Sequence, residues 1–115
     1  MVAISAGFKS AVQRVRWRAL FSQLVGAAFE VRAAREGCRF ANPAGLTEAA
    51  RALYAWEKEA AGSGASAPLA GLSPAEASLY LSAVHYAQLR ESRDGARQWE
   101  ALLALIECCL ALPLR

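Results

Sequence analysis

The residues with the clearest capacity for chemistry are basic side chains gathered in the first forty positions. They are Lys9, Arg14, Arg16, Arg18, Arg32, Arg35 and Arg39. The same segment holds only two acids, Glu30 and Glu36, so its net charge is +5, whereas the rest of the chain holds six bases and eight acids, a net of −2. The two parts give the +3 of the whole chain. Because a concentrated positive field attracts phosphate-rich or acidic partners, we expect these seven residues to bind a nucleic-acid backbone.

Two aromatic residues lie beside these bases. Trp17 stands between Arg16 and Arg18, and Phe40 follows Arg39. Aromatic and guanidinium groups together can stack on exposed bases while the arginines neutralise phosphates. Two other interpretations stay open. Trp17 can belong to the core, and the arginines can form a solvated face that pairs with acids further along the chain, namely Glu48, Glu57 and Glu59.

No pattern in the sequence indicates catalysis. The chain contains no G-x-S-x-G, no H-E-x-x-H and no glycine-rich phosphate loop. His85 is the only histidine and has no obvious carboxylate partner, and Glu100 and Glu107 share a helical face that should meet solvent or an arginine. We therefore expect a protein that is not an enzyme and that carries no cofactor.

The cysteines indicate free thiols. Cys38, Cys108 and Cys109 form an odd set without the spacing of a disulfide framework, which favours a reducing compartment. A zinc site built from these three and His85 is not expected, because vicinal cysteines suit tetrahedral coordination poorly and no C-x-x-C pair exists. Buried small apolar side chains are the simpler interpretation.

The composition predicts a single all-helical domain over residues 1–115. Hydrophobic residues make up 56% of the chain and charged residues 20%, which is enough for one packed core. Alanine, leucine, arginine and glutamate dominate, and no stretch alternates long enough to form a strand. No run approaches the roughly 20 apolar residues of a membrane span, and residues 1–12 are too polar for a signal peptide, so we expect a cytoplasmic protein without a membrane partner.

The first helix, expected over about residues 5–36, carries two apolar stripes. The earlier stripe holds Phe8, Val12 and Val15, and the later one begins at Trp17 and continues through Leu20, Phe21, Leu24, Ala28 and Val31. The two are out of phase by two residues, which is roughly 200° of helical rotation. Either the helix kinks near Arg16, or Phe8, Val12 and Val15 form an interface with another chain, which is the alternative we favour.

Three further helices follow from capping signals. Thr47 is expected to cap a helix that runs to about residue 60, and a flexible linker of small residues follows at about 62–71. Ser73, Pro74 and Glu76 form a capping box at the start of a helix to about Arg90. Asp94 should cap a last helix that runs to about Leu112. The expected fold is a compact bundle of about four helices with a long basic first helix and a C-terminal helical hairpin.

The last two helices are apolar on more than one face, which allows some of that surface to meet another subunit. These features favour a non-catalytic accessory subunit that binds a nucleic-acid backbone within a larger assembly. The small helical subunits of CRISPR effector complexes share this size, composition and one-sided basic character, an analogy of architecture that rests on no common motif. The alternative is a helical adaptor, such as a secretion chaperone, an anti-activator or an inhibitor, whose arginines meet an acidic protein surface.

Overall fold

The structure, a computed structural model, describes residues 6–37, 43–62 and 64–113, with side chains from residue 11 onward. It contains the helices α1 (Ala6–Glu36), α2 (Ala44–Gly62), α3 (Pro74–Ser92) and α4 (Gly95–Leu110), and a short 3₁₀ helix, η1 (Leu69–Gly71). No strand occurs in these ranges. The predicted all-α fold with a long first helix is therefore confirmed.

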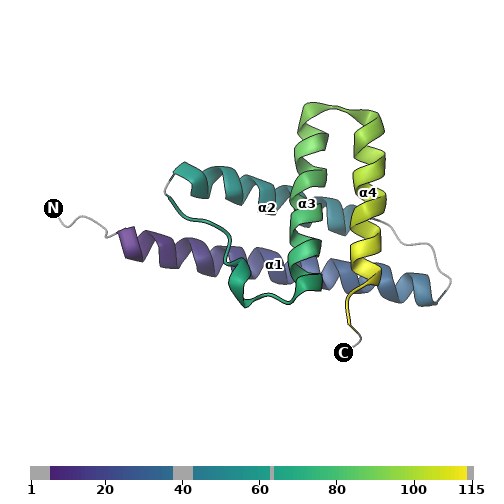
Figure 1. The fold of residues 1–115 in the computed structure, drawn as a ribbon, viewed down its shortest axis with the longest axis horizontal. Coiled ribbons are helices and arrows are strands. Elements are labelled where there is room, and N and C mark those ends of the chain that lie inside the picture. The colour runs from purple at the N-terminus through teal and green to yellow at the C-terminus, as the bar shows by residue number, and fades with distance from the viewer. Residues whose placement is uncertain (1–5, 38–42, 63, 114–115) are drawn as a thin grey trace.

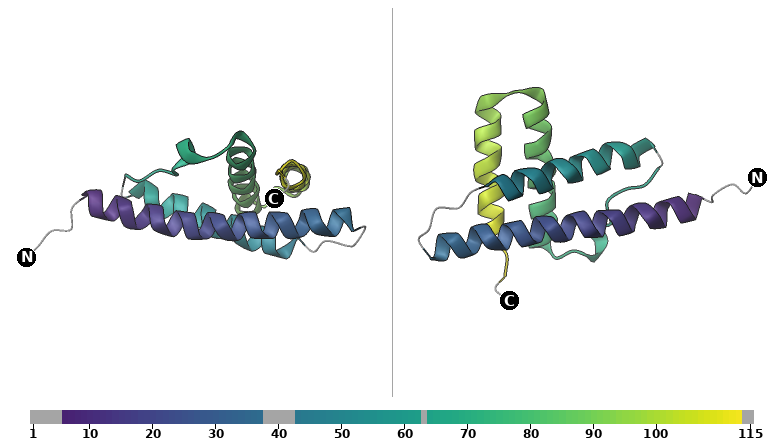
Figure 2. Two further views of the ribbon diagram at one scale, coloured as in Figure 1. Left: turned by 90° about the horizontal axis from the view of Figure 1, so that it is seen from below. Right: turned by 180° about the vertical axis from the view of Figure 1, so that it is seen from behind.

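The four helices form two antiparallel hairpins that cross one another. Figure 1 shows α1 and α2 side by side in one pair and α3 and α4 in the other. In Figure 2 the α3/α4 hairpin lies against one face of the α1/α2 pair, so the molecule has two layers. Among the described residues, no other helix covers the opposite face of the α1/α2 layer. The N-terminal end of α1, purple in Figure 1, projects beyond the C-terminal end of α2.

An aromatic cluster joins the two layers. The rings of Trp17 and Phe21 stack with centroids 4.8 Å apart, and Tyr80 from α3 meets the Trp17 ring edge-on at 5.4 Å. Within the α1/α2 layer, Trp56 Nε1 donates a hydrogen bond of 2.9 Å to the Gln13 carbonyl oxygen. The later stripe of α1 thus lies in the core: Trp17, Phe21, Leu24, Ala28 and Val31 are all buried.

Two of the three predicted helix caps are present. Ser73 accepts a hydrogen bond from the Glu76 amide while the Glu76 carboxylate accepts one from the Ser73 amide, which completes the capping box. Asp94 accepts from the Arg97 amide at the start of α4. The Thr47 cap was wrong, because α2 begins three residues earlier. Thr47 lies in the first turn, its amide donates to the Pro43 carbonyl, and its hydroxyl is 3.4 Å from the Tyr86 hydroxyl.

The segment between α2 and α3 packs partly against the core. Ala65, Ala67 and Leu69 are half-buried against buried residues of the hairpins. The flexibility of residues 62–71 stays a prediction. Among the described residues, no helix is both long enough and apolar enough to reach across a lipid bilayer.

Candidate nucleic-acid interface

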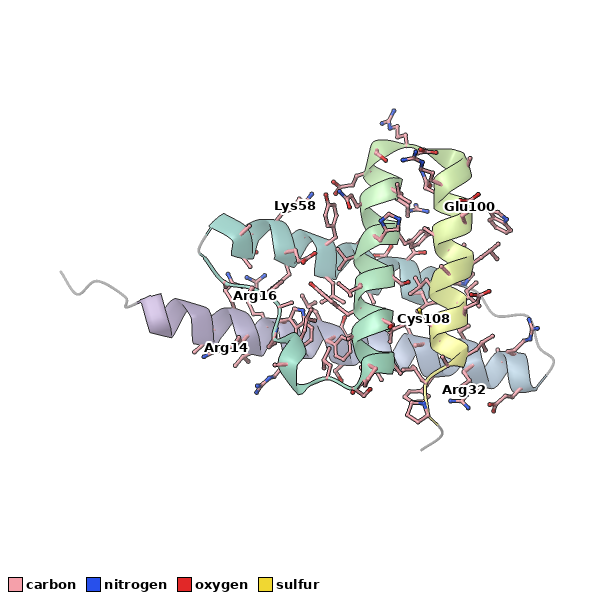
Figure 3. All side chains as sticks on the ribbon, in the orientation of Figure 1. Arg14, Arg16, Arg32, Lys58, Glu100 and Cys108 are labelled. Carbon is pink, nitrogen blue, oxygen red and sulfur yellow. The ribbon has the colours of Figure 1, made fainter. Side chains whose placement is uncertain are left out.

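The bases of α1 divide between two sides of the helix. At 100° of rotation per residue, Arg14, Arg18, Arg32 and Arg35 fall within about 100° of one another, and Arg16 lies about 160° from Arg18. Figure 3 shows Arg14 and Arg32 on the edge of α1 that faces away from α2, and Arg16 between α1 and α2. The structure therefore does not gather the described bases into one patch.

Arg16 is paired within the chain. Its Nη1 lies 3.1 Å from Glu59 Oε1 on α2 and 3.3 Å from Gln13 Oε1. The hydrogen bond and the charge of Arg16 hold the pKa of the Glu59 carboxyl below its usual value. Of the three acids considered as partners for the basic segment, Glu59 pairs with a base of that segment in the described structure. Glu48 instead lies 3.8 Å from Arg51, a base of α2. Arg16 is consequently a weaker phosphate ligand than its neighbours.

Arg32 is the least accessible of the described bases. Its side chain is only 14% exposed, and its Nε lies 3.1 Å from Glu36 Oε1. Its Nη1 atom is buried and has no hydrogen-bond partner within the described part of the chain. Its low exposure and its pairing with Glu36 make Arg32 a poorer phosphate ligand than the exposed bases of α1.

Arg14, Arg18 and Arg35 remain as exposed bases, and we refer to the first two as the edge arginines. None of them has an ion pair with another described residue. Arg14 and Arg18 are four residues apart, about 6 Å along the axis, and Arg35 lies about 25 Å beyond Arg18. The side chain of Lys9 and the whole of Arg39 lie outside the described residues. The exposed bases of α1 therefore form two separate points of positive charge, the edge arginines and Arg35.

The stacking role considered for Trp17 is wrong. The Trp17 side chain is only 2% exposed because it stacks on Phe21 and packs against Tyr80. Burial also raises the pKa of Tyr80 above its ordinary value. Phe40, the other aromatic residue beside a base, is outside the described residues. The described basic residues of α1 therefore offer phosphate neutralisation, without an exposed aromatic ring beside them for base stacking.

A shallow cavity of about 400 Å³ lies beside Arg18, between α1 and the segment that contains η1. Its polar lining comes from Arg18, Ser22 and Glu76. The Glu76 carboxylate is held by the capping box and adds negative charge to this side of Arg18. A phosphate is thus better received from the open side of α1 than from within the cavity.

The other candidate groups lie apart from the basic edge. His85, Glu100 and Glu107 are exposed on α3 and α4. Within the described ranges, no three histidine, cysteine or acidic side chains are close enough together to hold a metal ion. Cys108 and Cys109 are free thiols, and burial raises the pKa of the Cys109 thiol to about 12.

The earlier apolar stripe of α1 is uncovered. The helix continues through Arg16 without a break, so its kinked return onto the bundle does not occur. Val12 is 43% exposed and Val15 is 65% exposed on the side opposite the core, and the side chain of Phe8 lies outside the described residues. Contact of this stripe with another chain stays a prediction.

A second exposed apolar surface lies on α4, and it includes a residue that the sequence analysis missed. Trp99 is 63% exposed and Leu103 is 45% exposed, and Ile106 and Leu110 on the same face are half-buried. The spacing of these four residues, by four, three and four, would have indicated a continuous helical stripe.

Comparison with protein-family models, curated proteins and solved structures found no match to this chain.

Proposed function

We propose that the protein is a non-catalytic accessory subunit that binds a nucleic-acid backbone within a larger assembly. The observation that carries the proposal is the edge of α1 that faces away from α2, where Arg14 and Arg18 are exposed and unpaired among the described residues. Such side chains neutralise phosphates without reading the sequence of bases. Arg35 follows the buried Trp17 by eighteen residues, which is five full turns, so it projects from the Trp17 side of α1 and adds charge apart from this edge.

The proposal is tested by the double substitution of Arg14 and Arg18 by alanine. Each lost phosphate contact should reduce the steepness of log K against log salt by about 0.7 to 0.9, so the double variant should be shallower by about 1.4 to 1.8. Adding Arg16→Ala should bring the total change to roughly 2 to 3 if Arg16 also contacts a phosphate in the complex. The loss of affinity should be the same for oligonucleotides of unrelated sequence.

The matched control replaces Arg51 and Arg97 by alanine. Both are exposed, and each lies within 4 Å of an acid three residues earlier, Arg51 at 3.8 Å from Glu48 and Arg97 at 3.5 Å from Asp94. This control lowers the net charge of +3 by the same two units as the test variant. An equal loss of slope in both variants would show that total charge rather than the α1 edge governs binding, and would contradict the proposal.

The exposed apolar stripes favour a second candidate, a helical adaptor that binds another protein. Val15 and Trp99 expose more than three-fifths of their side-chain surface, and large contiguous apolar surfaces mark protein contacts. An adaptor should copurify in fixed stoichiometry with one protein after nuclease treatment, and its affinity for added RNA or DNA should be negligible.

A further inference from the structure

The exposed face of α4 has the spacing of a coiled-coil seam. Trp99, Leu103, Ile106 and Leu110 occupy alternating d and a positions of a heptad repeat, and we call them the α4 seam. One flank of this seam, at the e positions, carries Glu100 and Glu107, which are both exposed. The other flank, at the g positions, holds the half-buried Leu102 and the buried Cys109, and so faces the protein's own core.

The outer face of α1 has the same heptad spacing of apolar residues, but bases instead of acids flank it. Val12, Val15 and Ala19 are exposed at a, d and a positions, and we call them the α1 seam. In the sequence Phe8 continues the same spacing one turn earlier. Arg16 occupies the e position of this seam, and Lys9 occupies the preceding e position seven residues before. The acids that flank the α4 seam have the same seven-residue separation.

An antiparallel pairing of the two seams brings these charges together. In that orientation e positions face e positions, so Glu100 meets Arg16, while Leu103 and Ile106 meet Val15 and Val12. In the sequence, Lys9 occupies the e position opposite Glu107. A guanidinium has five donors, which allows Arg16 to keep Glu59 while it binds Glu100 of a second copy. Two copies cannot pair α4 with α4 as favourably, because an antiparallel two-fold would place Glu100 against Glu107.

We propose that the α4 seam of one copy of this chain binds the α1 seam of a second copy. The two seams lie on different surfaces of one molecule, so the contact is head-to-tail and each copy keeps one seam free for the next. A contact of three apolar layers is small, so the assembly should be weak and dependent on concentration. Arg14 lies off the seam, whereas Arg18 occupies a g position that flanks it, so nucleic acid has to be removed before self-association is measured.

The decisive experiment mixes two full-length variants, each with one seam blocked. Leu103→Asp blocks the α4 seam and Val15→Asp blocks the α1 seam, at side chains that are 45% and 65% exposed. After nuclease treatment, the unmodified chain should show a weight-average mass in sedimentation equilibrium that rises steadily with concentration. Each variant alone should stay at 12.3 kDa, and the mixture should form a species of twice that mass and nothing larger.

Charge reversal and a control site complete the test. Glu100→Arg with Glu107→Arg should abolish association, and adding Lys9→Glu with Arg16→Glu to the same chain should restore it. Leu81→Asp, at a side chain that is 55% exposed but lies on neither seam, should leave association unchanged. The proposal is overturned if the unmodified chain stays monomeric at all concentrations, or if the Val15→Asp variant associates as well as the unmodified chain. It is also overturned if the mixture fails to form the 1:1 species although both variants keep their helical circular dichroism.

Discussion

At the scale of single residues, the two adjacent thiols have different environments. Cys109 is fully buried, whereas Cys108 is half-buried with its Sγ 3.5 Å from Ser82 Oγ and 3.8 Å from the Ser78 carbonyl oxygen. Burial disfavours the Cys109 thiolate, which is why its pKa rises to about 12. Only the thiolate reacts with an electrophile, so burial and ionisation both protect this sulfur.

We predict that Cys109 resists a maleimide reagent in the native protein. In a variant with Cys38→Ser and Cys108→Ser, labelling at neutral pH should be slower by a factor on the order of 100 than in denaturant, because it requires local opening. Mass spectrometry of timed samples measures this rate. Equal rates in native and denaturing buffer would show that the sulfur is accessible.

The same thiol makes the stability of the folded protein decrease at high pH. In the unfolded chain Cys109 ionises near its ordinary value of 9, whereas in the folded chain it stays protonated to about 12. The unfolded state therefore binds fewer protons in this interval, and the Cys109 contribution to stability falls as the pH rises from 9 towards 12.

At the scale of elements, helix α3 depends on its first turn. Ser73, Pro74 and Glu76 satisfy amides that the helix itself leaves without partners. We predict that Ser73→Ala lowers the free energy of unfolding by about 1 kcal/mol, as measured by urea denaturation. An unchanged unfolding midpoint would contradict a role of the cap in stability.

The control for this substitution has to avoid strain. Gly64 lies in the preceding segment but has a φ of +74°, so an alanine there would be strained for its own reason. Ser66, which is exposed in the same segment, is the better site, and Ser66→Ala should change the unfolding free energy by less than about 0.5 kcal/mol.

These elements also show what the sequence could predict. The cap of α3, the Asp94 cap of α4 and the buried stripe from Trp17 to Val31 are local patterns, and the structure contains all three. The start of α2 was misplaced because Pro43 suits the beginning of a helix as well as Thr47 does. Of the two interpretations of Trp17, the core position that its apolar stripe indicates is confirmed and base stacking is not, because Trp17 is buried against Phe21 and Tyr80.

The candidate site was harder to predict than the fold. Charge counting located the bases on α1, but it could not show that Arg16 pairs with Glu59 or that Arg32 is mostly buried, since both depend on tertiary packing. Similarly, the exposure of Trp99 depends on α3 and α1 packing against the other face of α4. A periodic pattern identifies an apolar face without stating what covers it.

At the scale of the whole molecule, the crossed arrangement of the hairpins separates two kinds of surface. The α3/α4 layer covers one face of the α1/α2 layer and leaves the outer face and the far edge of α1 open (Figure 2). The edge carries the edge arginines, and the outer face carries Val12 and Val15. One long helix can thus present charge for a phosphate backbone and an apolar stripe for a protein contact at the same time.

The central claim, that this edge neutralises phosphates, is tested most directly by the salt dependence of binding by the unmodified protein. Fluorescence anisotropy with single-stranded and duplex oligonucleotides of unrelated sequence would measure the binding constant across a series of salt concentrations. If the two edge arginines and Arg35 all contact phosphates, log K should fall linearly with log salt with a slope of about −2 to −3 and little preference among sequences. Absence of binding at low salt, or a slope near zero, would contradict the proposed function.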